Sequence, residues 1–118
     1  MDNDSALLAV VQRHLGSDTR LQVVCADGDA FLKSLAGQRF AFIFADTWAG
    51  KYRLLDEALE LLNPGGLYVI DDMLPLPNWP DGHAAKAAHL MATLEQRKDI
   101  SMTALSWASG IVIATKRR

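Results

Sequence analysis

Cysteine is nearly absent from this sequence, because Cys25 is the single thiol among 118 residues. No internal disulfide can form, which is typical of proteins from a reducing compartment, and we expect a cytoplasmic location. Cys25 lies in the apolar run Leu21–Ala26. A lone cysteine in such a run is more often a small buried hydrophobe than a reactive thiol, and we expect it to be buried.

Long hydrophobic runs and a strong excess of one charge are also missing. No apolar stretch approaches the length of about 20 residues that crosses a bilayer. The acidic start Met1–Asp4 does not resemble a signal peptide. The formal net charge of −2 argues against nucleic acid as the main partner, although the chain ends in the basic residues Lys116–Arg118. Since half of its residues are hydrophobic, we expect one globular domain over residues 1–118 and no membrane partner.

The sequence also lacks a Gly-rich loop between a strand and a helix, which is the usual cradle for a nucleotide. One adjacent glycine pair, Gly65 and Gly66, follows Pro64 and precedes an apolar run instead of a helix. This pair therefore indicates a helix stop and a turn.

Alternating helical and strand-like segments make up most of what the sequence does contain. Apolar periodicity predicts helices over residues 5–15, 30–35, 52–62 and 82–97, with Asp4 or Ser5 capping the first and Asp81 the last. Apolar runs predict strands over 21–25, 40–45 and 67–70, and the segments 100–107 and 111–115 predict a closing hairpin. We therefore predict an α/β fold with a mostly parallel sheet, helices on both faces and a C-terminal antiparallel hairpin.

Aspartates follow two of the predicted strands. Asp46 ends the run at 40–45, and Asp71 and Asp72 end the next one. Carboxyl ends of parallel strands open onto one crevice, so these side chains are expected to share a site. Such carboxylates could hold Mg²⁺ or Ca²⁺. The alternative is that they shape strand-end turns or cap helices and bind no metal.

Four segments in order, 23–30, 42–48, 61–72 and 106–116, resemble a known family. Together they are similar to class I S-adenosylmethionine-dependent methyltransferases, and most closely to the small bacterial O-methyltransferases related to catechol O-methyltransferase. The resemblance implies a Rossmann-like three-layer sandwich, here truncated. It also implies S-adenosylmethionine as cofactor and methyl transfer to the hydroxyl of a small molecule.

The same resemblance implies roles for individual residues. Cofactor-binding residues would be Asp27, Asp29, Ala30, Asp46 and Trp48. Asp46 would be catalytic, and Asp46, Asp71 and Asp72 would hold a metal ion such as Mg²⁺. Other readings stay open: Asp29 or Asp27 could cap the helix that follows, and Trp48 could be an aromatic lid over the core. Trp79 could line an acceptor pocket or pack on the sheet edge. His83 and His89 are six residues apart, the wrong interval for metal ligands on one helix face.

The chain also departs from the family pattern. Family members begin with two further strands, which lie between the strands expected here at 21–25 and 40–45. Without them, either these two strands pair directly or the edge at 40–45 finds a partner in another molecule, and we expect a homodimer. Ala49 stands where metal-dependent relatives have a general-base lysine, and Lys51 follows two residues later. Relatives place Asn at the position of Asp72. A non-catalytic dimeric remnant that acts as a binding or regulatory module is therefore the alternative function.

Overall fold

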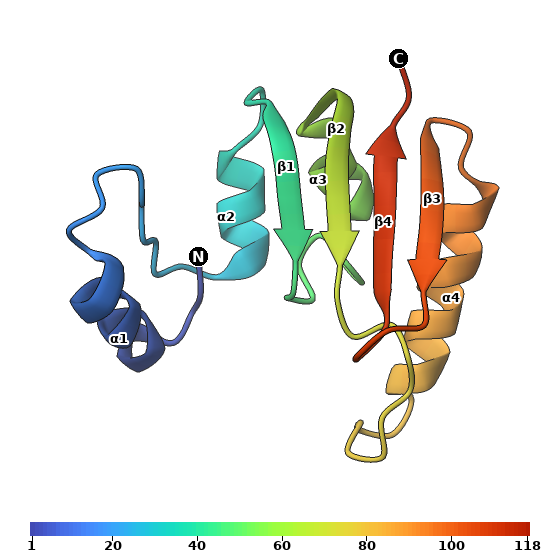
Figure 1. Cartoon of the computed structure of the whole chain (residues 1–118), viewed down its shortest axis with the longest axis horizontal. Coiled ribbons are helices and arrows are strands. Elements are labelled where there is room, and N and C mark those ends of the chain that lie inside the picture. Colours follow the sequence, from blue (N-terminus) through green and yellow to red (C-terminus); the bar gives the residue numbers. More distant parts are fainter.

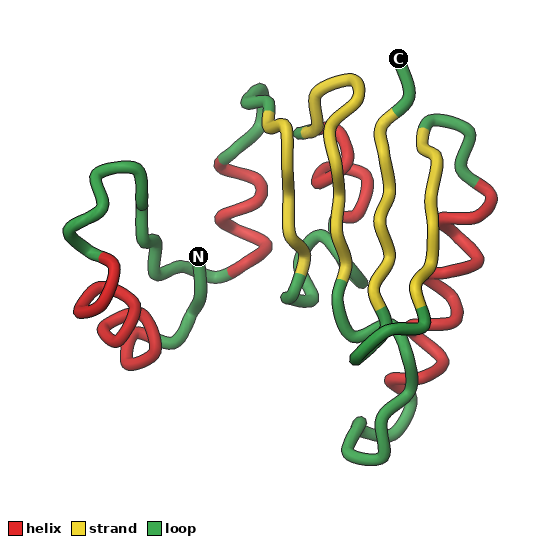
Figure 2. Tube along the Cα trace, in the orientation of Figure 1, coloured by secondary structure: helices red, strands yellow, loops and turns green.

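A computed structural model describes the whole chain, residues 1–118, as four helices and four strands (Figure 1). Their bounds in chain order are α1 (Ser5–Leu15), α2 (Gly28–Ser34), β1 (Phe40–Ala45), α3 (Leu55–Glu60), β2 (Leu62–Ile70), α4 (His83–Gln96), β3 (Ile100–Leu105) and β4 (Ile111–Lys116). Figure 2 shows the long loops after α1 and after β2. None of the four helices combines the length and the apolar character that a membrane span needs.

The four strands form one mixed sheet in the order β1-β2-β4-β3. Only β1 and β2 are parallel, while β4 is antiparallel to both β2 and β3. The hairpin of β3 and β4 is confirmed, but the prediction of a mostly parallel sheet is wrong. The sheet is mostly antiparallel because β4 takes part in two of the three pairings and runs antiparallel to both neighbours. In addition, the expected parallel strand at 21–25 does not join the sheet.

Residues 21–25 are not a strand. Their pairing is limited to an isolated bridge between Asp2 and Cys25, and the segment lies with α1 on the far side of α2 from the sheet (Figure 1). An extended segment that does not pair with a neighbouring strand buries little of its surface, so Cys25 is exposed. The predictions of a strand and of a buried thiol here are therefore wrong, and the outer edge of β1 is unpaired.

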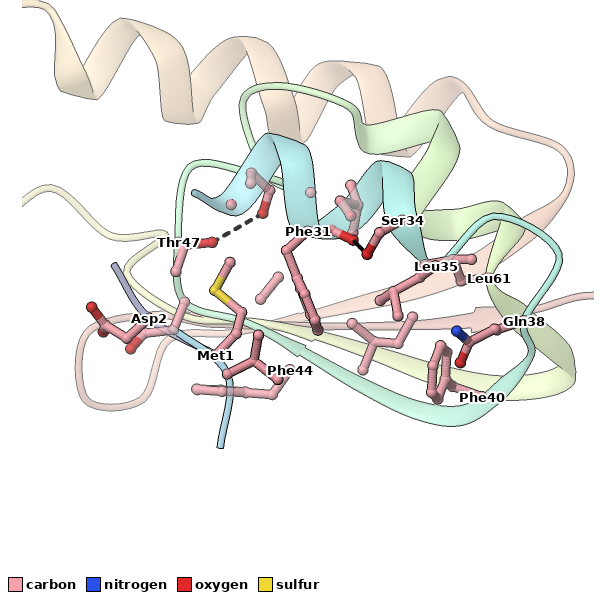
Figure 3. Close-up of a pocket in the computed structure, with 18 of the residues that line it drawn as sticks. Met1, Asp2, Phe31, Ser34, Leu35, Gln38, Phe40, Phe44, Thr47 and Leu61 are labelled. Carbon is pink, nitrogen blue, oxygen red and sulfur yellow. Dashed lines mark hydrogen bonds between the residues drawn. The ribbon is translucent and has the colours of Figure 1, made fainter. Parts of the chain in front are cut away.

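The sheet is covered on one face. Helices α3 and α4 supply the helical part of the core (Ala58, Leu59, Ala87, Leu90 and Leu94), which packs against sheet residues that include Tyr68 and Ile70. Helix α2 contacts α3 on that side (Figures 1 and 3). On the other face, the side chains of Phe42 and Phe44 are 57% and 51% exposed. The expected three layers, with helices on both faces, are thus reduced to two.

Caps explain where most helices begin. Asp4 accepts hydrogen bonds from the amides of Ala6 and Leu7 and caps α1, as predicted. Helix α4 departs from the prediction, because its N-cap is Gly82 with φ of 78° and Asp81 makes no cap bond. Helix α3 is shorter than the predicted 52–62, since residues 48–53 form a loop and Leu62 already begins β2.

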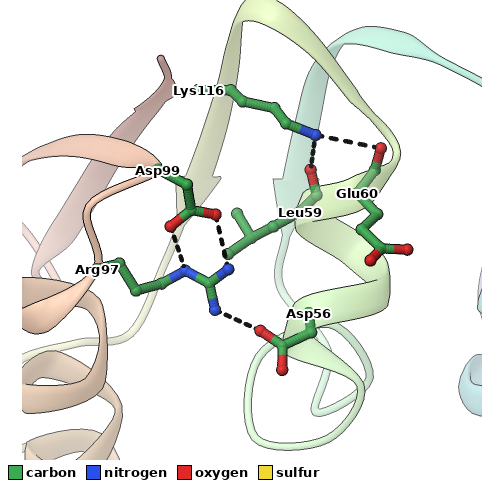
Figure 4. Close-up of polar contacts among 6 residues, drawn as sticks. All are labelled: Asp56, Leu59, Glu60, Arg97, Asp99 and Lys116. Carbon is green, nitrogen blue, oxygen red and sulfur yellow. Dashed lines mark hydrogen bonds and ion pairs between the residues drawn. The ribbon is translucent and has the colours of Figure 1, made fainter. Parts of the chain in front are cut away.

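Two basic side chains hold the ends of α3: Arg97, which follows α4, contacts its first turn, and Lys116 of β4 contacts its last turn (Figure 4). Arg97 donates to both carboxylate oxygens of Asp99, at 2.9 and 2.7 Å, and also to Asp56. Hydrogen bonding to Arg97 lowers the pKa of Asp99. Lys116 Nζ donates to the carbonyl of Leu59 at 2.9 Å, which satisfies an open carbonyl at the C-terminal end of α3.

Candidate functional site

The aspartate-bearing ends of β1 and β2 lie side by side. Ala45 pairs with Ile70 in the parallel register, and the amide of Asp71 donates to the carbonyl of Ala45 at 3.4 Å. Asp46 and Asp71 therefore follow at the same edge of the sheet. Partial burial, together with the charges of Asp71 and Asp72, raises the pKa of Asp46, while Lys51 opposes this shift. The edge is thus electrostatically negative around Asp46.

The three carboxylates do not fit a metal ion. Asp71 Oδ1 accepts hydrogen bonds from the Ser109 hydroxyl and from the amide of Asp72 at 2.7 Å. Its carboxylate is therefore tied to the β3–β4 turn. No group of three carboxylate, imidazole or thiolate side chains in the chain is arranged to hold a metal ion. The magnesium site suggested for Asp46, Asp71 and Asp72 does not form in this structure.

The loop after β1 brings Lys51 to these strand ends. Gly50 has φ of 79°, a backbone conformation that favours glycine, and its carbonyl accepts a hydrogen bond from the hydroxyl of Tyr68. The chain then turns so that the amides of Lys51 and Tyr52 both donate to the carbonyl of Trp48. As a result the Lys51 side chain is only 4% exposed, and its Nζ donates to the carbonyl of Asp71.

The charge state of Lys51 reflects two opposing effects. Burial lowers the pKa of Lys51, and the charges of Asp72, Asp46 and Asp71 work against this shift. Sequence reasoning noted Lys51 only as displaced from the position of Ala49. Its contact with the strand ends depends on Tyr68, far away in sequence, so local periodicity carries no signal for it.

Trp48 belongs to an aromatic cluster next to the strand ends. Its ring lies edge-on to Tyr52 and His83, with centroid distances of 5.7 and 5.8 Å. The Tyr52 hydroxyl is 2.9 Å from His83 Nε2, and Trp79 stacks on His83 with centroids 4.3 Å apart. Lys86 Nζ lies 4.2 Å from the Trp48 ring centroid, a cation–π distance. Trp79 thus packs at the start of α4, and His83 holds the cluster together.

A cavity of about 820 Å³ runs along the open edge of β1, between this strand, α2 and the segment that contains Gln22 and Val24 (Figure 3). Phe31 reaches into it from α2, and Phe40 and Phe44 line it from β1. Asp46 and Thr47 lie at its end. Most of the residues that line the cavity are apolar. At the strand ends, the anionic residue available to a ligand is Asp46.

A second cavity of about 240 Å³ continues the first. The two share the lining residues Met1, Asp2, Gly28, Thr47 and Ala49. The second adds Asp27 and Trp48. Three residues predicted to bind cofactor, Asp27, Asp46 and Trp48, therefore line one or the other of two adjoining cavities.

Asp29 and Ala30, which were also predicted to bind cofactor, line neither cavity. The carboxylate of Asp29 forms an ion pair with Arg53 at 2.8 Å. The Ala30 amide donates to Asp27 Oδ1 at 3.0 Å, so Asp27 is the cap of α2. Both groups already have partners within the chain, and a nucleotide that used them would have to displace those partners.

Comparison with known proteins relates this arrangement to methyltransferases. No family model and no curated protein matches the sequence. Solved structures do match. An O-methyltransferase from Bacillus cereus in complex with S-adenosylhomocysteine is 17% identical with a TM-score of 0.80, over 97% of this chain and 60% of its own.

Two further matches agree with this one. An S-adenosylhomocysteine-bound methyltransferase from Podospora anserina is 18% identical with a TM-score of 0.79, over 100% of this chain and 59% of its own. A methyltransferase from Geobacter sulfurreducens is 19% identical with a TM-score of 0.75, over 99% and 56% of the two chains.

These matches confirm the resemblance at the level of the fold. The chain is similar in structure to small bacterial O-methyltransferases along nearly its whole length. It spans about 60% of the length of those structures. Of the four sequence segments that carried the resemblance, those at 42–48, 61–72 and 106–116 are the strands β1, β2 and β4 with their ends. The segment at 23–30 is not a strand and leads into α2.

Proposed function

We propose that this chain is part of an S-adenosylmethionine-dependent methyltransferase that acts on a hydroxyl group of a small molecule. The observation that supports the proposal most is the pair of adjoining cavities beside α2 and β1, whose lining includes Asp27, Asp46 and Trp48. Two of the similar structures hold S-adenosylhomocysteine, the demethylated form of this cofactor. The fold and the placement of these side chains therefore support the same function.

The residues present fit a cationic nucleoside in part. The cavity offers a long apolar wall, and the Asp46 carboxylate stands at the end where a positive charge would be stabilised. Trp48 is 43% exposed and offers a ring edge beside that end. The outer edge of β1 is open, so this chain supplies one wall of the site, and the other requires the part of the fold that it does not span.

Within such a site, the cofactor supplies an electrophilic methyl group, and the chain's own residues position the acceptor and manage its proton. Asp46 is the proposed catalytic residue. Its pKa is raised by burial and by Asp71 and Asp72, which makes its carboxylate a better proton acceptor than an ordinary aspartate. The aromatic cluster of Trp48, Tyr52 and His83 would form the wall against which an acceptor is oriented.

Isothermal titration calorimetry with S-adenosylhomocysteine tests this function. We expect saturable binding that Asp46→Asn weakens, whereas Asp18→Asn does not, because Asp18 forms its ion pair with Arg20 away from the cavities. Absence of binding at high micromolar ligand would contradict cofactor binding by this chain. In a protein of the relatives' length, turnover that survives Asp46→Asn unchanged would show that Asp46 is not catalytic.

A second candidate function, a non-catalytic homodimeric binding module, is favoured by two observations. The edge of β1 is unpaired, and the outer face of the sheet exposes Phe42, Phe44, Leu67 and Leu105. Open edges and exposed apolar faces promote association. Light scattering would give a dimer mass for this candidate, and Phe42→Thr with Phe44→Thr would lower it. A monomer that binds S-adenosylhomocysteine tightly would instead favour the enzyme.

A further inference from the structure

We propose that the ammonium group of Lys51 is the resident cation of the strand-end carboxylates Asp46, Asp71 and Asp72, so that this site works without a divalent metal ion. The inference deepens the proposed function, on which its catalytic meaning rests, because it says which cation serves the site. The structural claim, that one lysine takes the place of a metal ion, rests on contacts within the chain.

The burial of Lys51 requires compensation by other groups. Lys51 is the one charged residue in the buried set, with 4% of its surface exposed. An ammonium group removed from water is costly unless other groups replace its hydration. Nζ donates to the carbonyl of Asp71 and lies 5.2 Å from the centroid of the Tyr52 ring. A carbonyl and a ring face are neutral partners, so most of the compensation has to come from nearby charge.

That charge comes from the ends of two strands. Asp46 follows β1, and Asp71 and Asp72 follow β2. None of the three forms a close ion pair with Lys51. The hydrogen bond from Nζ to the Asp71 carbonyl places the ammonium at the end of β2, and the pairing of Ala45 with Ile70 brings the end of β1, with Asp46, to the same edge. A backbone carbonyl thus holds the ammonium at the strand ends that carry the three carboxylates, and their charges favour its charged form.

The geometry of the three carboxylates disfavours the binding of a second cation. Asp71 Oδ1 is already occupied by the Ser109 hydroxyl and the Asp72 amide. Asp72 adopts φ of 56°, and no three carboxylates converge on one point. A divalent ion placed here would therefore lose ligands and would also meet the fixed positive charge of Lys51.

The position of Lys51 is fixed by packing that does not involve the carboxylates. Tyr68 is 1% exposed and its hydroxyl holds the carbonyl of Gly50, the residue before Lys51. The amide of Gly50 in turn donates to the carbonyl of Arg53 at 2.7 Å. The lysine is therefore placed by a closed loop, which suits a permanent counter-ion better than a side chain that swings in and out.

The first test asks whether the wild-type chain binds divalent cations. Thermal unfolding is followed with millimolar Mg²⁺ or Ca²⁺ against K⁺ at equal ionic strength, and terbium emission sensitised by tryptophan is measured in parallel. We expect no shift of the unfolding midpoint and no saturable terbium signal. A saturable stabilisation by Mg²⁺ or Ca²⁺ that Asp46→Asn removes would overturn the proposal and restore the metal site.

The second test removes the proposed counter-ion. Lys51→Met keeps most of the apolar stem and deletes the charge, and the exposed Lys98 provides the matched control, Lys98→Met. We expect the unfolding midpoint of Lys51→Met to fall by several degrees. Adding Asp46→Asn should raise this midpoint by more than it raises that of the wild type, because the uncompensated carboxylates then repel one another less, while Lys98→Met leaves the midpoint unchanged. An unchanged midpoint in Lys51→Met, or one that Asp46→Asn raises no more than it raises the wild type, would contradict the proposal.

If Lys51→Met does not fold, Lys51→Arg and the wild-type measurements still decide the question. Lys51→Arg keeps the positive charge, and we expect it to remain indifferent to Mg²⁺; a new response to Mg²⁺ would count against the proposal. None of these measurements uses the cofactor. Failure to bind S-adenosylhomocysteine would therefore refute the proposed function and leave the cation result standing.

Discussion

Alanine substitution at Gly50 gives a sharp test of how the loop after β1 is held. Gly50 and Gly65 have nearly the same backbone conformation, with φ of 79° and 81°. A Cβ atom at Gly65 would meet nothing within 4 Å, whereas at Gly50 it would lie 2.6 Å from the Tyr68 hydroxyl oxygen and 3.3 Å from the Cβ of Ala58. Gly65→Ala therefore measures the backbone cost alone, and Gly50→Ala adds the clash.

The magnitudes follow from these two terms. Left-handed backbone costs a residue with a side chain about 1–2 kcal/mol, so Gly65→Ala is expected to lower the free energy of unfolding by about that amount. Overpacking adds about 1–3 kcal/mol, so Gly50→Ala is expected to cost about 2–5 kcal/mol. Tyr68 cannot swing aside cheaply because it is 1% exposed. Urea unfolding followed by tryptophan fluorescence measures both variants.

A double-mutant cycle separates the clash from other effects. Tyr68→Phe leaves the buried carbonyl of Gly50 without its donor and is expected to cost about 1–3 kcal/mol. In that background the Cβ at residue 50 no longer meets the hydroxyl oxygen, so Gly50→Ala should cost clearly less than in the wild type; the contact with the Ala58 Cβ at 3.3 Å still keeps its cost at or above that of Gly65→Ala. Equal costs for Gly50→Ala and Gly65→Ala in the wild-type background, or strictly additive costs in the cycle, would refute the described loop path.

Other predictions concern charge at the two ends of the sheet. Asp46→Asn is expected to be more stable than the wild type at neutral pH. The pKa of Asp46 is raised in the folded state, so the wild type loses stability as pH rises through the ordinary aspartate range. The unfolding midpoints of the wild type and of Asp46→Asn should therefore converge in acid. A variant less stable than the wild type at neutral pH would contradict this. The lowered pKa of Asp99 has the opposite sign: its contribution is present above the ordinary aspartate range and is lost as pH falls through the lower folded value. Asp99→Asn should therefore flatten the acid limb of a plot of stability against pH, and an unchanged limb would exclude this role. Lys116→Met should cost about 1–2 kcal/mol in chemical unfolding because the Leu59 carbonyl at the end of α3 loses a charged donor, whereas Arg118→Met, at the exposed C-terminus, should cost nothing measurable.

Local signals in the sequence predicted much of the secondary structure. The continuous apolar run at 40–45 became β1 with the same bounds, and the alternating segments near the C-terminus became the β3–β4 hairpin. Asp4 and Asp27 cap the helices that follow them. The parallel register of β1 and β2 also placed Asp46 beside Asp71. Each of these features depends on residues close in sequence or on one strand pairing.

The features that sequence reasoning missed depend on distant contacts. The segment at 21–25 has strand-like composition but no neighbouring strand, so Cys25 is exposed instead of buried. The outer face of the sheet carries apolar side chains such as Phe42 with no helix over them. Lys51 reaches the strand ends because the hydroxyl of Tyr68 holds the preceding loop residue. Composition and periodicity do not encode any of these three outcomes.

The central claim is that the cavity between α2 and β1 is a nucleoside site with Asp46 at its end. The most direct test is a titration of the ¹⁵N-labelled chain with S-adenosylhomocysteine, followed by amide chemical shifts in two-dimensional NMR. We predict saturable shifts centred on residues 46–48 and on residues 27 and 28, with β3 unaffected. Shifts confined to α4, or no shifts at saturating ligand, would contradict the claim.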